Sequence, residues 1–289
     1  MTDSPDLVVL AAGAGRRFGG LKQLAPVGPA GEALLEFTIH DALTAGFGRI
    51  VIVVSEASEA PLRSRLERLD RECVFVRQPP ESPRSPRGTA SALLAARESV
   101  ERPFAVVNGD DFYGRESLEL AAAALGSSPP ARAPVLTLVG FPVQETLSVG
   151  GPVSRALCEV DAEGWLVRLR ELPEVRVLEG RIVGRYDGGA EERIAPGTLV
   201  SMNLWCAAPA LFPLLDRARG VPGGQAEFQL PSAIALGLDR GWLRVRVVRG
   251  PGRWCGLTFA ADLAPARERM AALTEERLYP TPLWRRAPG

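Results

Sequence analysis

The chain has 289 residues, of which 46% are hydrophobic and 24% charged, a composition that excludes a disordered or fibrous protein and allows a sizeable core. Its 34 basic residues balance its 34 acidic ones, which argues against a nucleic-acid or membrane-surface binder because such proteins carry a basic excess. No apolar run approaches the ~20 residues that span a bilayer, and the N-terminus is acidic rather than basic, so we expect a cytoplasmic protein without a secretory signal.

The first half of the chain alternates short apolar runs with amphipathic segments. The apolar runs predict strands over residues 7–12, 49–54, 73–76, 104–107 and 135–139. The amphipathic segments predict helices over residues 32–45, 61–69, 89–100 and 114–125. Strands that alternate with helices form βαβ units, which build a mainly parallel sheet with helices on both faces.

The second half has a different pattern. Strand-like runs around Gly164 and Gly180 predict antiparallel ribbons over residues 154–172 and 175–186. Further strands are predicted over residues 198–207 and 243–248, and further helices over residues 209–219, 227–238 and 261–277. We therefore expect one α/β domain over residues 1–277 with two halves that meet near residue 145. The tail over residues 278–289 has no periodicity, and the sequence leaves it either docked or free.

The cysteines and the single histidine do not form a metal site or a disulfide pattern. Cys73, Cys158, Cys206 and Cys255 lie in apolar or mixed runs, and none belongs to a CxxC pair. Buried thiols in a reducing compartment are the expected state. His40 lies within a predicted helix, and we assign it a structural role.

The clearest candidate site is the run LAAGAGRRFGGLK, from Leu10 to Lys22, where a buried strand ends in a glycine-rich loop. Glycines let backbone N–H groups approach phosphates, and Arg17 and Lys22 can neutralise further negative charge. The run is neither a dinucleotide fingerprint nor a Walker loop, because Phe18 replaces a required Gly and Gln23 a required Ser or Thr. An ordinary strand–helix turn is the alternative, but Lys22 is the only lysine of the chain, which favours a functional loop.

A second candidate follows the strand over residues 104–107, in the run Asn108-Gly109-Asp110-Asp111. Ligands of parallel sheets bind beyond the carboxyl ends of the strands, and Mg²⁺ prefers one or two carboxylates together with phosphate oxygens and water. A turn with a helix cap is the alternative. We favour a metal site, because two adjacent carboxylates are costly without a cation or solvent.

These motifs resemble the signature of the sugar-phosphate nucleotidyltransferases, LAAGxGxRx…K, and the resemblance is sharp over the first 115 residues. It implies a Rossmann-like three-layer sandwich of the nucleotide-diphospho-sugar transferase type. The sandwich would have a mainly parallel mixed sheet and an added antiparallel substrate-binding part. Residues 1–145 would then be the nucleotide-binding half and residues 146–277 the acceptor-binding half.

The resemblance also implies roles for single residues. Arg17 and Lys22 would act on the phosphates, with Lys22 at the transferring α-phosphate, and Asp110 would be both catalytic and the Mg²⁺ ligand. In this family a GTA element and an upstream Gln contact the nucleobase. Here they correspond to Gly88-Thr89 and Gln78. An ordinary helix start explains Gly88 and Thr89 equally well. The expected nucleotide-binding residues are Leu10, Ala11, Ala12, Gly13, Gly15, Gln78, Gly88, Thr89, Asn108 and Gly109.

The acceptor half carries weaker signals. In related enzymes Asn and Glu side chains bind sugar hydroxyls, which makes Glu171, Asn203 and Glu227 candidates here, although capping or surface pairing explains each as well. Related chains often have Gly where this one has Ala156, so the acceptor pocket is expected to differ. Many relatives also have a second metal-binding acid near the C-terminal strand; Asp262 lies closest here, and helix capping is its expected role.

The implied reaction joins a nucleoside triphosphate and a sugar 1-phosphate to give a nucleotide sugar and pyrophosphate, with Mg²⁺ and in-line attack on the α-phosphate. The acceptor phosphate has a second pKa of ~6, so no general base is required. Three alternative functions stay open: a glycosyltransferase, transfer to a non-sugar phosphate, and a non-catalytic sensor of nucleotides or nucleotide sugars. The sequence also leaves the oligomeric state open.

Overall fold

The computed structural model describes residues 4–13, 15, 17–67, 69, 73–80, 87–126, 134–186, 189–221 and 227–284. In this part of the chain eleven strands form one mixed sheet, and two short strands form a separate pair. The main sheet contains β1 (Asp6–Ala11), β2 (Arg49–Val54), β3 (Cys73–Arg77), β4 (Phe104–Asn108), β6 (Val135–Pro142), β7 (Val153–Val160), β8 (Leu166–Leu178), β9 (Arg181–Arg185), β10 (Glu191–Arg193), β11 (Leu199–Ala207) and β12 (Arg244–Arg249). The separate pair is β5 (Asp111–Phe112) with β13 (Cys255–Gly256).

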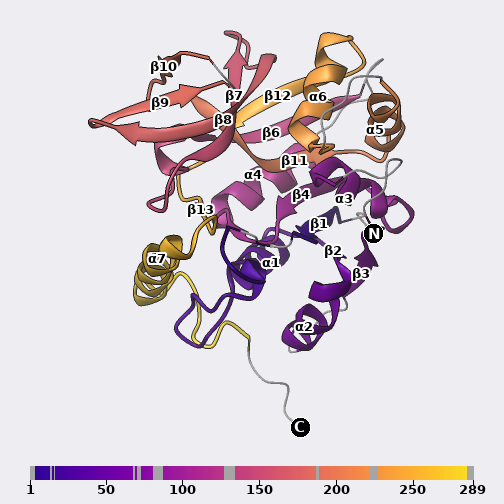
Figure 1. The fold of residues 1–289 in the computed structure, drawn as a ribbon. Coiled ribbons are helices and arrows are strands. Elements are labelled where there is room, and N and C mark those ends of the chain that lie inside the picture. The colour runs from indigo at the N-terminus through magenta and orange to yellow at the C-terminus, as the bar shows by residue number, and fades with distance from the viewer. Residues whose placement is uncertain are drawn as a thin grey trace.

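The strand order places the two halves of the chain in the same sheet. The order is β10-β9-β8-β7-β11-β4-β1-β2-β3, and β6 pairs with both β11 and β12. Strands β4, β1, β2 and β3 are parallel to their neighbours in the first half, whereas β7 to β11 pair antiparallel. Figure 1 shows the antiparallel strands at the top of the molecule and the parallel strands below them. The predicted α/β fold, with a parallel half and an added antiparallel part, is confirmed.

Helices cover both faces of this sheet and make three layers (Figure 1). The helices are α1 (Leu34–Thr44), α2 (Glu56–Leu66), α3 (Thr89–Ala95), α4 (Arg115–Gly126), α5 (Leu211–Arg219), α6 (Leu230–Asp239) and α7 (Leu263–Glu275). Alternate residues of β1 point to opposite faces, so Leu7 and Val9 pack with α1, α2 and α4, whereas Val8 and Leu10 pack with α3, α5 and α6.

Two helices begin at least three residues away from their predicted first residue. The helix predicted over residues 61–69 is α2, which starts at Glu56 because the N–H of Ser58 donates to the hydroxyl of Ser55 at 3.2 Å and caps the first turn. Pro61 therefore lies inside the helix. The helix predicted over residues 227–238 is α6, which starts at Leu230 because Pro231 occupies its first turn, a position where proline is favoured.

Helix α7 and the residues that follow it pack against α1 and form a hydrophobic cluster separate from the two that cover the faces of the sheet. Tyr279 and Leu283 are 5% and 4% exposed, so the tail over residues 278–284 is docked on its own chain; residues 285–289 lie outside the described part. The hydroxyl of Tyr279 donates to the buried carboxylate of Asp41 at 2.6 Å. The His40 ring lies 5.4 Å from the ring of Trp284, which agrees with its predicted structural role.

The prediction of buried thiols holds for two of the four cysteines, because Cys73 and Cys255 are only partly buried. All four cysteines are free, Cys158 and Cys206 are buried, and burial raises the pKa of both thiols to about 12. Within the described residues, no helix combines the length and apolar character required to cross a membrane.

Candidate active site

The glycine-rich loop after β1 is held in shape by its own backbone and by one buried glutamine. The side chain of Gln23 donates to the carbonyl oxygens of Ala11 at 2.9 Å and Gly13 at 3.3 Å. Gly15 has a φ of +58°, and a Cβ there would lie 1.9 Å from the carbonyl oxygen of Gly20. Gly13, by contrast, has no atom near its missing Cβ and faces open space. The loop therefore leaves room for a ligand at Gly13 while Gly15 and Gln23 fix its path.

Lys22 and Asp110 meet at the carboxyl end of the parallel strands. Strand β4 pairs with β1 up to Asn108 and Leu10, and the N–H of Gly109 then donates to the carbonyl of Leu10 at 2.9 Å. This contact places Asp110 beside the loop, where its carboxylate forms an ion pair with the Lys22 ammonium. The two side chains are 20% and 22% exposed, so both opposite charges remain accessible at one edge of the sheet.

Glycine is required at position 109 because the two strands are so close there. A Cβ on Gly109 would lie 2.9 Å from the Cβ of Ala11. The predicted nucleotide-binding residues Leu10, Ala11, Ala12, Gly13, Gly15, Asn108 and Gly109 therefore belong to one connected region.

Asp111 differs from Asp110 although the two are adjacent. Its side chain is buried, and its Oδ2 accepts hydrogen bonds from the amide of Asn108 at 2.8 Å and from the hydroxyl of Tyr113 at 3.3 Å. Burial and the charge of Asp110 raise the pKa of Asp111 to about 7, against the opposing effects of the Asn108 hydrogen bond and of Lys22. Asp111 is therefore inaccessible to a ligand, whereas the carboxylate of Asp110 is accessible at this edge of the sheet.

Asn203 connects the acceptor half to this network. It lies at a break in the pairing of β11 with β6 and has a φ of +62°, a conformation that Asn tolerates better than most residues. Its side-chain amide donates to Asn108 Oδ1 at 3.2 Å and accepts from the indole N–H of Trp205 at 3.3 Å. The predicted acceptor residue is thus close to the nucleotide-binding residues, with both ends of its amide already engaged.

The acids at this edge can be tested as ligands for Mg²⁺. Asp262 is excluded as a ready second ligand, because its carboxylate accepts from the N–H groups of Thr258 and Phe259, both at 2.8 Å, and from the hydroxyl of Ser148. Asp262 makes no side-chain cap bond at the start of α7; its carboxylate caps the short 3-10 helix over Ala260–Asp262 that precedes α7. Within the described residues, no group of three or more His, Cys, Asp or Glu side chains could hold a metal alone. Asp110 still fits Mg²⁺ that arrives with a triphosphate, because one carboxylate then suffices.

Arg17 lies at the outer rim of the loop. Its side chain is exposed, and the guanidinium carbon lies 5.6 Å from the centre of the Phe259 ring. The loop after β13 thus supports Arg17 from the C-terminal part of the chain. A guanidinium stacked on a ring at a loop rim remains free to bind phosphate oxygens.

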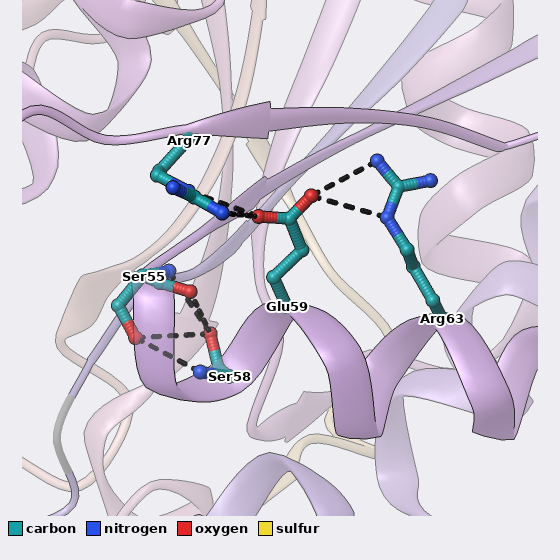
Figure 2. Close-up of polar contacts among 5 residues, drawn as sticks. All are labelled: Ser55, Ser58, Glu59, Arg63 and Arg77. Atoms are coloured by element: carbon teal, nitrogen blue, oxygen red, sulfur yellow. Dashed lines mark hydrogen bonds and ion pairs between the residues drawn. The ribbon is translucent and has the colours of Figure 1, made fainter.

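The start of α2 lies beside the loop, and Figure 2 shows the polar contacts that connect it to Arg77 at the end of β3. Ser58, in the capped first turn of α2, also donates to the carbonyl of Ala11 at 3.2 Å. Glu59 accepts from the guanidinium groups of Arg63 and Arg77, at 3.0 Å or less, and these bonds lower the pKa of Glu59. The Arg77–Glu59 pair holds β3 to α2, and the next residue, Gln78, donates its N–H to the carbonyl of Val54 at 2.8 Å. Gln78 is therefore positioned at the end of β3, as a base contact requires.

Gly88 and Thr89 are in contact with the segment before α6. A Cβ on Gly88, whose φ is +129°, would lie 2.2 Å from the carbonyl oxygen of Phe228. The hydroxyl of Thr89 donates to Gln229 Oε1 at 3.0 Å, and the amide of Gln229 donates to the carboxylate of Glu227 at 2.5 Å. The predicted base element and the predicted acceptor residue Glu227 are thus joined through Gln229.

Glu171 lies where β8 faces α6. One carboxylate oxygen accepts from the hydroxyl of Ser154 and the other from that of Ser232, both at 3.1 Å. The residue borders a pocket of about 350 Å³ that is also lined by Ala156. The predicted acceptor residue Glu171 therefore shares a cavity with Ala156, the position where related chains often have Gly.

Sequence patterns missed several residues that build this site. Gln23, Tyr113 and Gln229 act through bonds to residues distant in the chain, which local patterns do not reveal. Arg155 is buried, donates to Thr146 and to the Ser154 carbonyl, and has its pKa lowered to about 10 by burial. A polar residue within an apolar run was the one available signal for Arg155 and Gln23.

Known proteins resemble this chain in sequence and in fold. The sequence model of the MobA-like NTP transferase domain matches residues 7–167, more than half of the chain. No curated protein sequence matches this one.

Two solved structures are similar over almost the whole chain. The inositol-1-phosphate CTP transferase from T. maritima is 18% identical with a TM-score of 0.63, covering 94% of this chain and 97% of that one. A UDP-glucose pyrophosphorylase complexed with UDP-glucose is 17% identical with a TM-score of 0.61, covering 95% and 100%. These likenesses show a shared nucleotide-diphospho-sugar transferase fold.

Proposed function

The chain belongs to the MobA-like NTP transferase family, and from that premise we propose that it joins a nucleoside triphosphate to a sugar 1-phosphate. The products are a nucleotide sugar and pyrophosphate. A new bond forms between an oxygen of the acceptor phosphate and the α-phosphorus, and the bond from that phosphorus to the bridging oxygen of pyrophosphate breaks. The transfer is in line, which requires positioning rather than a covalent enzyme intermediate.

The observation that carries this proposal is the ion pair between Lys22 and Asp110. It brings the glycine-rich loop and the acid after β4 together at the end of the parallel strands, where ligands of such sheets bind. A phosphate would meet the ammonium of Lys22, and a cation would meet the carboxylate of Asp110. A plain strand–helix turn gives no reason for these two charges to converge while both stay accessible.

The residues of the loop supply positioning and charge. The acceptor phosphate is mostly ionised at neutral pH, so its oxygen attacks without a general base. Lys22 stabilises the charge on the α-phosphate, and Arg17 neutralises the leaving pyrophosphate. Gly13 leaves space for the triphosphate at the open part of the loop.

Mg²⁺ is the cofactor that this donor set fits, with Asp110 as its protein ligand. When bound, Mg²⁺ neutralises and orients the triphosphate. Asp111 has a supporting part, because its carboxylate fixes the Asn108 amide through a 2.8 Å hydrogen bond.

The organic part of the acceptor would bind in the second half of the chain. Glu171 borders the pocket there, and Glu227 lies before α6. Asn203 contributes by holding Asn108, because both ends of its amide are engaged by the protein. The nucleobase would lie between Gln78 and the Gly88-Thr89 turn.

The first experiment measures thermal stability with each nucleoside triphosphate in the presence and absence of Mg²⁺. A ligand at a hundredfold its Kd adds about 2.7 kcal/mol, which corresponds to a rise of roughly 5–10 °C. A Mg²⁺-dependent rise with one triphosphate supports the proposal and identifies the base. Absence of any rise contradicts it.

The second experiment follows pyrophosphate release with that triphosphate and a panel of acceptor phosphates. Release with sugar 1-phosphates supports the proposed reaction, whereas release only with alcohol phosphates favours transfer to a non-sugar acceptor. Triphosphate binding without release from any acceptor identifies a non-catalytic sensor. A rise in thermal stability only with nucleotide sugars would instead favour a sensor or a glycosyltransferase.

A further inference from the structure

The segment over residues 254–262 connects the C-terminal part of the chain to the turn that carries Asp110. Strand β13 in this segment pairs with β5, which begins at Asp111. The N–H of Leu257 then donates to the carbonyl oxygen of Asp110 at 3.2 Å. These contacts fix the backbone of the segment relative to the candidate site. Phe259 follows two residues later and is the one aromatic residue between β13 and α7.

Hydrogen bonds and close packing hold Phe259 in place. Its N–H and that of Thr258 both donate to Asp262 Oδ2 at 2.8 Å. The hydroxyl of Ser148 donates to Oδ1 of the same carboxylate at 2.5 Å. The turn that follows Ser148 packs directly against Phe259, because a Cβ on Gly150 would lie 2.4 Å from the Cβ of Phe259. The position of the ring is therefore restricted by Asp262 and by Gly150.

Arg17 of the glycine-rich loop meets this ring. Its guanidinium carbon lies 5.6 Å from the centre of the Phe259 ring, within the ~6 Å at which an aromatic face attracts a cation. Among the residues that the structure describes, no carboxylate forms an ion pair with Arg17. A long side chain loses conformational freedom when it binds an anion, and a contact that restricts it beforehand reduces this cost. The Phe259 ring is positioned to do this for Arg17.

A second guanidinium contacts the same segment. Arg155 is 7% exposed, and its guanidinium carbon lies 5.4 Å from the centre of the Trp254 ring. In the described part of the chain it donates only to carbonyl and hydroxyl oxygens and forms no ion pair. Burial lowers the pKa of Arg155 to about 10; the charges of Asp111 and Asp262 oppose this effect, and the charge of Arg17 adds to it. Two positive charges that affect each other favour an anion with more than one negative charge.

We propose that Phe259 is a positioning residue, which holds Arg17 toward the pyrophosphate that leaves the triphosphate. The inference rests on the proposed function and adds the residue that directs the arginine of the loop. Pyrophosphate gains negative charge as its bond to the α-phosphorus breaks, so a guanidinium fixed beforehand stabilises it without reorganisation. The buried charge of Arg155 favours the same anion.

The experiment measures the binding of inorganic pyrophosphate with Mg²⁺ to the full chain by calorimetry. A cation over a ring at an exposed site changes an equilibrium about two- to fivefold, so Phe259→Leu should weaken pyrophosphate binding at least about twofold. Binding of the nucleoside monophosphate with the preferred base should not change, because it lacks the pyrophosphate group. Phe75→Leu is the matched control: the guanidinium of Arg63 lies 4.3 Å from the centre of that ring, but Phe75 belongs to β3. This control should bind both ligands like the wild type.

A double-mutant cycle tests whether Phe259 acts through Arg17. Arg17→Ala should itself weaken pyrophosphate binding, and the effect of Phe259→Leu should disappear in that background, because the ring then has no cation to hold. Gly150→Ala is an independent test. The φ of Gly150 is not in the left-handed region, so the new Cβ acts through its contact with Phe259. This variant should reproduce the loss seen in Phe259→Leu.

The outcomes separate this inference from the proposed function. A smaller loss in Phe259→Leu, or the same loss with and without Arg17, overturns the inference. An equal loss of monophosphate binding also overturns it, because the variant then disturbs the fold as a whole. In each of these cases, pyrophosphate release by the wild type with an acceptor leaves the transferase standing. A wild type that binds neither a triphosphate nor pyrophosphate overturns the inference and the proposed function together.

Discussion

Replacing Lys22 with alanine separates the stability of this site from its chemistry. The variant removes the cation that pairs with Asp110, and the two side chains are 22% and 20% exposed. Water screens an ion pair at that exposure, so its contribution to the free energy of unfolding is about 0.5–1 kcal/mol. We therefore expect the Tm of Lys22→Ala to fall by only about 1–4 °C.

The expected effect on turnover is much larger. A fixed positive group at a phosphate that gains charge in the transition state contributes about 3–4 kcal/mol, a factor of about 10²–10³ in kcat. Lys22→Arg should keep the pairing with Asp110 and hence the Tm. It should recover only part of kcat, because a broad planar guanidinium replaces a compact ammonium.

The assay combines pyrophosphate release with thermal unfolding of the wild type and the two variants. Arg181→Ala is the matched control, since it removes an exposed positive charge from β9. A kcat of Lys22→Ala within tenfold of the wild type would refute the role of Lys22 in the reaction. A fall in Tm above about 10 °C would show instead that the residue mainly supports the fold.

Three further predictions concern the loop, the buried acid and the tail. Gly15→Ala should weaken triphosphate binding, measured by calorimetry, at least tenfold, because the new Cβ would lie 1.9 Å from the carbonyl oxygen of Gly20. Gly19 also has a positive φ, but the space around its missing Cβ is open, so Gly19→Ala should weaken binding less. Equal effects of the two variants would contradict the steric argument. The pKa of Asp111 is raised to about 7 from 3.8, so the folded state holds this proton more tightly and the resulting stability is lost as pH rises toward and through 7. Without divalent cations, urea unfolding should show a loss of about 1–3 kcal/mol between pH 5 and pH 8 in the wild type and a smaller loss in Asp111→Asn; equal losses would exclude Asp111 as the cause. Tyr279→Phe leaves the buried Asp41 without its 2.6 Å hydrogen bond and should cost about 1–3 kcal/mol in the free energy of unfolding, whereas an unchanged Tm would show that this hydrogen bond adds no stability.

The sequence predicted the candidate site best where charged residues follow a predicted strand. Lys22 and Asp110 could be predicted to approach each other, because each follows an apolar run and the carboxyl ends of parallel strands meet at one edge. The resemblance to a family then indicated a ligand for the charges at that edge, since a glycine-rich loop by itself does not distinguish a phosphate site from a turn.

Long-range contacts account for what could not be predicted. Nothing near Thr89 in the chain indicates that its hydroxyl bonds to Gln229, 140 residues away. The break in β11 at Asn203 depends on how β11 pairs with three strands, β6, β7 and β4, and periodicity does not encode that register. Likewise, the tail packs through two separate side chains, Tyr279 and Leu283. Two isolated contacts leave no periodic pattern in the sequence.

A series of side-chain hydrogen bonds holds Asp111 in place and distinguishes it from the adjacent acid, Asp110. Trp205 donates to Asn203, Asn203 to Asn108, and Asn108 to Asp111. Each amide accepts at its oxygen and donates from its nitrogen, so the chain has one direction and ends on the Asp111 carboxylate. Asp110 lies in the turn before β5, and its carboxylate pairs with Lys22, whereas the carboxylate of Asp111 is buried. The second half of the chain thereby helps to hold the buried carboxylate of Asp111 in the first half.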